Sequence, residues 1–137
     1  MKNIKFLFIA FSFFFYNCSN DDSPSQESDD QNLSKMHSEI IAASMVNTTP
    51  CTNSAELSFA AIGSKACGGP LGYIAYSLKI DVPEFLKKVE NYTKAQEAYN
   101  KKWGVFSTCD MMIRPPSGIG CTNGKPTLIY SDPHVKI

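Results

Sequence analysis

Four cysteines, Cys51, Cys67, Cys109 and Cys121, most strongly constrain how the part of the chain after Pro50 can fold. An even number of cysteines in a short chain predicts a disulfide framework, which stabilises domains too small to build a large hydrophobic core. The competing interpretation is a metal site. The long spacings and the lack of a Cys-x-x-Cys pair disfavour that interpretation. We therefore predict two disulfides and no metal.

A long helix is predicted from Asp81 to about Trp103. Asp81 suits the N-cap position, Glu84 follows at the capping-box spacing, and Pro83 falls in the first turn, where its missing N–H costs nothing. Gly104 suits the position just after the helix. Apolar residues at three- and four-residue steps make one stripe, interrupted only by Gln96: Phe85, Val89, Tyr92, Tyr99 and Trp103.

The other segments favour strands. Residues 71–80, 105–114 and 127–130 are rich in aliphatic and aromatic side chains, and residues 57–61 alternate weakly. Glycines and prolines separate these runs. The expected fold class is α+β, with one long helix packed on a small antiparallel sheet and held by two disulfides.

This arrangement favours one disulfide pairing out of the three that four cysteines allow. A strand ending at Ile80 would lead directly into the helix, so the two would run antiparallel over similar lengths of about 30 Å. The helix would then end near the start of the strand, which brings Cys109 toward Cys67. Cys51 would pair with Cys121. Each bond is expected to contribute a few kcal/mol.

The N-terminus resembles an export signal. Lys2 and Lys5 precede an apolar run over residues 6–16. The run is about 11 residues long, whereas a membrane-spanning helix needs about 20. Residues 1–17 are therefore predicted to be a signal peptide. The alternative, a buried N-terminal strand or helix, is disfavoured because a Ser- and Asp-rich segment follows.

Phe15-Tyr16-Asn17-Cys18 resembles a lipobox, the motif in which the cysteine is acylated and becomes the new N-terminus. The family pattern prefers Leu where Phe15 stands and a small residue where Asn17 stands. Residues 19–22 look like the acidic surface-export signals of Bacteroidota lipoproteins. The resemblance implies an outer-membrane lipoprotein that is held in the membrane by acylated Cys18. The acidic signal favours the cell surface, and the periplasmic face is the alternative. The alternative is a secreted protein with an unpaired Cys18.

Residues 18–50 are predicted to be a lipidated, flexible tether, with a short helix near residues 34–46. Its acidic part contains no base and too few large apolar residues to fold alone. From Cys51 to the C-terminus there are ten bases against seven acids, and the bases are dispersed. Arg114 is the only arginine, so nucleic acid is not an expected partner. The acids of residues 19–32 are Asp21, Asp22, Glu27, Asp29 and Asp30.

The most distinctive motif is Cys67-Gly68-Gly69-Pro70. With Tyr76-Ser77, Tyr99-Asn100, Ser107-Thr108-Cys109, Pro115-Pro116 and Cys121, it resembles a family of short exported bacterial proteins that has no assigned activity. The resemblance covers residues 51 to about 125. It implies a shared fold for the predicted domain at residues 51–137 and no particular chemistry.

The same motif supplies a candidate binding loop. One interpretation is a rigid turn leading into a strand. The other is an exposed loop, preorganised by its disulfide, that inserts into a partner protein. The residues of the candidate loop are Lys65, Ala66, Gly68, Gly69 and Pro70, with Arg114 as a further candidate.

Two further groups of residues could form binding surfaces, or they could simply belong to the hydrophobic core. Residues 111–116, with Met111 and Met112, could form a recognition patch or fill gaps in the core. The aromatic residues could line a sugar-stacking face, although helical spacing favours core packing. They are Tyr73, Tyr76, Tyr92, Tyr99 and Trp103.

No catalytic apparatus is predicted. The two histidines, His37 and His134, are far apart in the sequence, and oxidised cysteines cannot act as nucleophiles. Asp110 and Asp132 could be a catalytic carboxylate pair, but no second feature of the sequence supports this. No nucleophile-elbow, zincin or P-loop motif occurs. We expect no enzyme activity and no cofactor.

Three functions remain open. The leading prediction is a membrane-anchored, non-catalytic module that binds a protein or a glycan. The second is an inhibitor or immunity-type protein that blocks a secreted hydrolase such as a protease or a lysozyme-like enzyme. The third is a structural component of the cell envelope.

Overall fold

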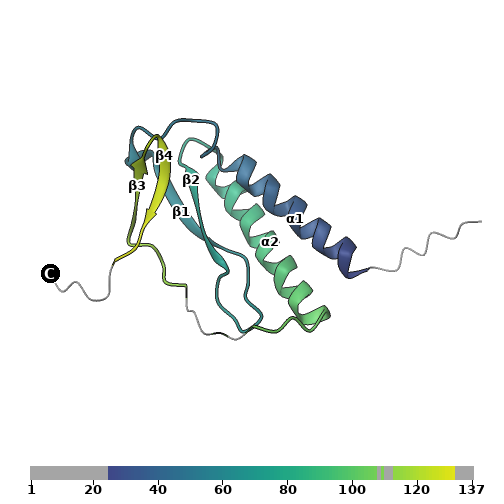
Figure 1. Cartoon of the computed structure of the whole chain (residues 1–137). Coiled ribbons are helices and arrows are strands. Elements are labelled where there is room, and N and C mark those ends of the chain that lie inside the picture. Colours follow the sequence, from purple (N-terminus) through teal and green to yellow (C-terminus); the bar gives the residue numbers. More distant parts are fainter. Residues whose placement is uncertain (1–24, 108, 110–112, 132–137) are drawn as a thin grey trace, which may run out of the picture.

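The computed structural model describes residues 25–107, 109 and 113–131, which form an α+β fold in three layers (Figure 1). A pair of helices covers one side of a two-stranded sheet, and a second two-stranded sheet lies on the other side. The predicted class is confirmed, but within the described residues a second long helix packs beside the predicted one, and the strands form two small sheets rather than one. The elements are α1 (Gln26–Ala43), the 3₁₀ turn η1 (Ser54–Glu56), β1 (Leu57–Ile62), β2 (Gly72–Ser77), α2 (Val82–Lys102), β3 (Gly118–Thr122) and β4 (Lys125–Ile129).

The core lies between the helices and the sheet of β1 and β2. These strands pair antiparallel, with Ala60 opposite Ile74. Because side chains alternate between the two faces of a strand, Ala60 and Ile74 share the helix-facing side with Ile62 and Tyr76. The rings of Tyr76 and Phe85 lie 4.8 Å apart between their centroids. The buried core residues are Leu33, Ile40, Ile62, Ile74, Tyr76, Phe85, Val89 and Tyr92.

Helix α2 has the predicted ends and the predicted buried face. The Asp81 carboxylate accepts a hydrogen bond from the Glu84 N–H at 3.0 Å, so Asp81 is the N-cap. Phe85, Val89 and Tyr92 of the predicted stripe are buried. Trp103 ends the helix, and Gly104 follows at φ +58°, a conformation that glycine adopts without steric cost.

Helix α1 corrects the prediction of a flexible acidic tether. It begins at Gln26 with Ser25 as N-cap, so residues 26–32 are helical, and the helix is longer than the predicted one at residues 34–46. Leu33 and Ile40 are buried against the rest of the core. Propensity reasoning missed this because α1 is weakly apolar in itself, and tertiary contacts supply the stability that it lacks alone.

Both ends of α1 are fixed to the rest of the fold. Near its start, Asp29 pairs with Lys102 at 2.6 Å and accepts a hydrogen bond from the Trp103 indole at 3.0 Å. At its end, the backbone oxygen of the fully buried Ser44 accepts a hydrogen bond from Ser77 N–H at 3.0 Å. Helix α1 is therefore part of the folded unit.

Strands β3 and β4 form a hairpin. Asn123 and Gly124 join them at φ +52° and +72°, as a type I′ turn requires. The predicted strand at residues 127–130 corresponds to β4. The predicted strand at residues 105–114 is wrong in its described part, because residues 105–107, 113 and 114 belong to no strand. The Val105 N–H instead bonds to the Asn100 carbonyl and closes the end of α2.

The two disulfides form with the predicted pairing. Cys51 pairs with Cys121 across a Cα–Cα distance of 5.4 Å, and Cys67 pairs with Cys109 across 6.1 Å. They indicate an oxidising, extracytoplasmic environment. The predicted signal peptide and Cys18 lie outside the described residues. Within the described residues, neither helix is long and apolar enough to cross a membrane.

Candidate functional site

The candidate binding loop connects β1 to β2 and is fastened to α2 at its start. Gly63 N–H donates to the Thr93 hydroxyl at 3.0 Å, and Ser64 N–H donates to the Gln96 side-chain oxygen at 3.1 Å. The Asn100 side chain donates back to the Ser64 carbonyl at 2.8 Å. Gln96, the polar interruption of the apolar stripe on α2, therefore satisfies the backbone of this loop.

The tip of the loop is a tight turn closed by a disulfide. The Lys65 N–H donates to the Gly69 carbonyl, and the Gly68 N–H donates to the Lys65 carbonyl, both at 3.0 Å. Gly68 and Gly69 take φ values of +96° and +79°. Seven residues line a pocket of about 200 Å³ at this turn: Lys65, Cys67, Gly68, Gly69, Pro70, Cys109 and Ile113.

The structure brings most of the predicted loop residues together. Lys65, Gly68, Gly69 and Pro70 line the same pocket, and Ala66 is exposed beside them. Arg114 is also exposed and follows Ile113, which lines that pocket. The turn is therefore preorganised, which both interpretations of the motif require.

The aromatic residues do not form one sugar-stacking face. Tyr76 and Tyr92 are buried in the core, as helical spacing favoured, and burial raises the pKa of Tyr92. Tyr73 packs edge-on against Phe59 with ring centroids 6.2 Å apart. Tyr99 and Trp103 are half-buried at the junction of α2 and α1.

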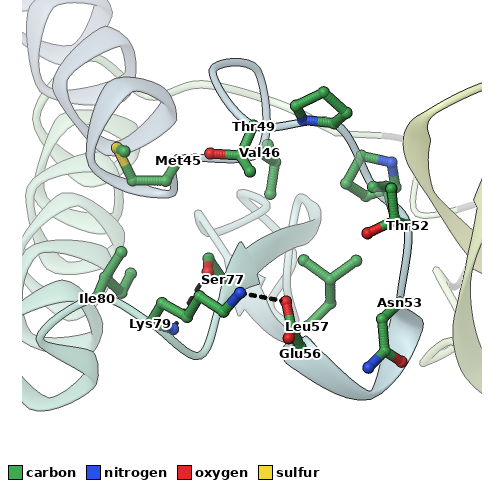
Figure 2. Close-up of a pocket in the computed structure, with 13 residues that line it drawn as sticks. Met45, Val46, Thr49, Thr52, Asn53, Glu56, Leu57, Ser77, Lys79 and Ile80 are labelled. Carbon is green, nitrogen blue, oxygen red and sulfur yellow. Dashed lines mark hydrogen bonds and ion pairs between the residues drawn. The ribbon is translucent and has the colours of Figure 1, made fainter.

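A second pocket, of about 240 Å³, lies at the opposite end of the molecule (Figure 2). The end of α1 leads into its wall through Met45, which adopts φ +60°. Sequence reasoning missed this pocket because its walls come from three separate segments. The lining residues are Met45, Val46, Thr49, Pro50, Cys51, Thr52, Asn53, Glu56, Leu57, Ser77, Lys79, Ile80 and Pro126.

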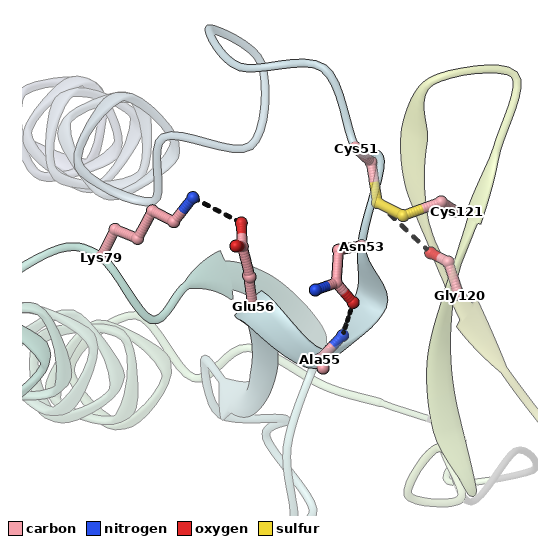
Figure 3. The surroundings of a disulfide bond; sticks show 7 residues. All are labelled: Cys51, Asn53, Ala55, Glu56, Lys79, Gly120 and Cys121. Atoms are coloured by element: carbon pink, nitrogen blue, oxygen red, sulfur yellow. Dashed lines mark hydrogen bonds and ion pairs between the residues drawn. A yellow bond between two sulfur atoms is a disulfide. The ribbon is translucent and has the colours of Figure 1, made fainter.

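The Cys51–Cys121 disulfide holds one wall of this pocket. Figure 3 shows it joining the segment before η1 to β3. The Cys51 N–H also donates to the Gly124 carbonyl at 2.8 Å, so this wall is fixed to the hairpin twice. Asn53 then caps η1 by accepting a hydrogen bond from the Ala55 N–H at 3.0 Å. The pocket wall is thus a crosslinked loop.

Charge at this pocket is confined to one surface ion pair. Lys79 and Glu56 lie 2.5 Å apart, and both side chains are largely exposed. The lining includes three aliphatic side chains, those of Val46, Leu57 and Ile80. Among the described residues, no aromatic side chain lines the pocket, and its cysteine is oxidised. Such a site suits an apolar ligand group that has hydrogen-bond donors or acceptors at its edges.

Titratable groups shifted by their surroundings lie away from both pockets. Lys102 and the Trp103 indole lower the pKa of Asp29, and Lys94 lowers the pKa of Glu90. His37 is exposed on α1, with its ring centroid 5.6 Å from that of Tyr92. Among the described residues, no three His, Cys, Asp or Glu side chains are grouped so that they could hold a metal ion.

Several predicted candidates lie outside the described residues. They are Cys18, Asp110, Met111, Met112, Asp132 and His134.

Comparison with known proteins gives no match. No family model, no curated protein and no solved structure is significantly similar to the chain.

Proposed function

We propose that the chain is an exported lipoprotein, anchored by acylated Cys18, whose domain binds a protein without catalysing a reaction. The observation that supports this most directly is the pocket at residues 45–57 and 77–80, with Pro126, which we call the pocket end. It is an apolar recess in a wall fixed by a disulfide. Preorganisation of this kind reduces the entropy that is lost when a partner binds.

The lining of the pocket favours a protein partner over a glycan. Sugar-binding sites stack sugar rings on aromatic side chains, and this pocket has none. Its volume of about 240 Å³ suits a single large apolar side chain of a partner, the usual centre of a protein interface. The hydroxyl groups of Thr49 and Thr52 at the rim can exchange hydrogen bonds with the partner's backbone.

The geometry also supports a non-catalytic role. The charged groups that line the pocket are Glu56 and Lys79, which neutralise each other at the surface. The hydroxyl of Ser77 accepts a hydrogen bond from the Lys79 N–H. No histidine of the described part of the chain lines the pocket to activate that hydroxyl.

The test is capture of partners by the mature, disulfide-intact chain from Ser19 onward. The bait is incubated with secreted proteins of the producing cell, lysates of neighbouring bacteria and host fluids. Val46→Asp places a charge in the aliphatic part of the lining and should weaken capture by more than about tenfold, as loss of a central interface residue does. Phe106→Ser, at the other end of the molecule, is the matched control and should retain the partner.

Equal capture by both variants would exclude the pocket end as the binding site, and turnover of a substrate by the purified chain would refute the non-catalytic role. Thermal unfolding of each variant establishes that it is folded.

A second candidate function uses the Lys65–Pro70 turn as an inhibitory loop. The observation that favours it is the closed turn, with two backbone hydrogen bonds and an exposed disulfide. If a secreted hydrolase is the captured partner, substitution of Lys65 and Gly69 should abolish inhibition. An unchanged inhibition constant would exclude this loop.

A further inference from the structure

One end of the molecule exposes three large apolar side chains. Phe106 is 86 % exposed, Leu71 46 % and Val105 38 %. Leu71 and Val105 line the same groove between α1 and α2, and Phe106 directly follows Val105. Single exposed apolar residues need no explanation, but a cluster that includes an almost fully exposed phenylalanine does.

The backbone around this cluster is held in place. The Leu71 N–H donates to the Ile62 carbonyl at 3.1 Å, and the Val105 N–H donates to the Asn100 carbonyl at 3.0 Å. The Ser107 hydroxyl lies 3.8 Å from the Cys67 sulfur. We call residues 63–71 and 103–107, with Cys109, the loop end. Its exposed side chains project from a fixed backbone.

The segment that carries Cys18 joins the fold at this same end. The start of α1 is bound to the end of α2 through Asp29, Lys102 and Trp103, and Gln26 donates to the Tyr99 hydroxyl at 3.2 Å. Figure 1 shows the start of α1 beside the end of α2, with the loop between β1 and β2 reaching toward them. The pocket end lies beyond the far end of α1, which is about 27 Å long from its 18 residues.

The chain between Cys18 and Ser25 limits how far the domain can stand from the membrane. Six residues lie between these positions, so the seven steps from Cys18 to Ser25 span at most about 25 Å even when fully extended. An acylated Cys18 therefore keeps the start of α1, which lies at the same end of the molecule as the loop end, within that distance of the bilayer, whereas the pocket end can face away from it.

We propose that the loop end docks on the phospholipid surface through Phe106, Val105 and Leu71, which rests on the proposed anchor at Cys18. Aromatic and aliphatic side chains at a membrane surface bury about 5–10 Å into the boundary between headgroups and acyl chains. A second contact of this kind stabilises a lipid-anchored protein and fixes its orientation. The pocket end then points away from the membrane.

The charges around the loop end indicate which lipid is sufficient to test membrane docking. At and beside the loop end, the cations Lys65, Lys101, Lys102 and Arg114 are nearly balanced by the anions Asp29, Asp30 and Glu97. Near-neutral charge gives little attraction to anionic lipid, so docking depends on apolar contact. Zwitterionic phosphatidylcholine vesicles are therefore a sufficient probe.

The test measures the depth of one residue in the membrane. Trp103 is the only tryptophan, so Trp103→Phe gives a protein without tryptophan fluorescence. In this background, Phe106→Trp reports on the loop end. Leu86→Trp is the matched control, because Leu86 is 39 % exposed on the first turns of α2, near the pocket end. Each full-length acylated chain is reconstituted into phosphatidylcholine vesicles with and without bromine on an acyl chain, which quenches nearby tryptophan.

We expect brominated lipid to quench the fluorescence of the Phe106→Trp variant and to blue-shift its emission, with the fluorescence of the Leu86→Trp variant unaffected. Vesicle flotation, measured on the same samples, separates the two possible failures. Flotation without quenching at residue 106 would leave the anchor intact and overturn the docking proposal. Loss of flotation would overturn the anchor and the docking together. Equal quenching at both residues would also overturn the proposed orientation.

Discussion

At the scale of single residues, Gly63 shows how closely the candidate loop approaches α2. Its φ is +71°, and a Cβ atom there would lie 2.4 Å from the Gln96 side-chain oxygen and 2.9 Å from the Leu71 Cβ. Gly68 also has positive φ, but no atom of the described residues would lie within 4 Å of its Cβ. Substitution of Gly68 therefore adds backbone strain alone, whereas substitution of Gly63 adds both backbone strain and steric overlap.

We predict that Gly63→Ala destabilises the protein by about 2–3 kcal/mol and Gly68→Ala by about 1 kcal/mol, because only the first adds a collision to the strained backbone. Urea unfolding of both variants measures the difference. Equal losses would mean that Gln96 and Leu71 move aside without cost.

The ionisation of Asp29 makes the stability of the fold depend on pH. Its pKa is lowered from 3.8 chiefly by the hydrogen bond from Lys102 and then by that from Trp103. A carboxyl group whose pKa is lower in the folded state stabilises the fold above its unfolded pKa and loses that contribution as the pH falls through the folded pKa.

We therefore predict that the start of α1 loosens only below about pH 4, the usual range of an aspartate. Because Trp103 is the single tryptophan and bonds to Asp29, its fluorescence follows this event directly. Asp29→Asn removes the ionisable group and should remove the acid step. The same step in both proteins would assign it to another group.

At the scale of elements, sequence patterns predicted those parts whose signals are local. Helix α2 was predictable because its cap, its stripe and its terminal glycine all agree. The full length of α1 was not, because its acidic first turns are stabilised by Lys102 and Trp103, which are far away in the sequence. Strand β3 was missed because Gly118 and Gly120 resemble a loop, whereas the Asn123-Gly124 turn signals the hairpin.

The same distinction applies to the candidate sites. The Lys65–Pro70 turn was predictable from one short motif whose glycines and cysteine define it. The pocket end was not, because Val46, Leu57, Ile80 and Pro126 come from three separate segments that meet only in the folded chain.

The contribution of α1 to the fold is testable at Ile40, which is 1 % exposed. We predict that Ile40→Ala lowers the free energy of unfolding by about 2–4 kcal/mol, the usual cost of a cavity in a core. Lys35→Ala, on the exposed side of the same helix, should change it by less than about 0.5 kcal/mol. If Ile40→Ala were as mild as Lys35→Ala, α1 would not be a stable part of the unit.

At the scale of the whole molecule, the two disulfides stabilise opposite ends. Cys51–Cys121 fixes the wall of the pocket end, and Cys67–Cys109 closes the turn of the loop end. The closed loops span 70 and 42 residues, so each bond restricts the unfolded chain by a similar amount, about 4 kcal/mol in the chain-entropy model. Their accessibility differs, because Cys51 is 8 % exposed whereas Cys67 and Cys109 are both exposed.

This difference predicts an order of reduction, because a thiolate must reach a sulfur atom to attack it. Under native conditions a mild dithiol should reduce Cys67–Cys109 first, while Cys51–Cys121 remains oxidised until the chain unfolds. Alkylation with mass spectrometry identifies the bond that opens, and partner capture by the half-reduced protein then assigns function to an end. Capture that survives reduction of Cys67–Cys109 places the partner at the pocket end, whereas capture lost at that step places it at the Lys65–Pro70 turn. Reduction of both bonds at one rate would show instead that the pocket wall opens as readily as the exposed turn.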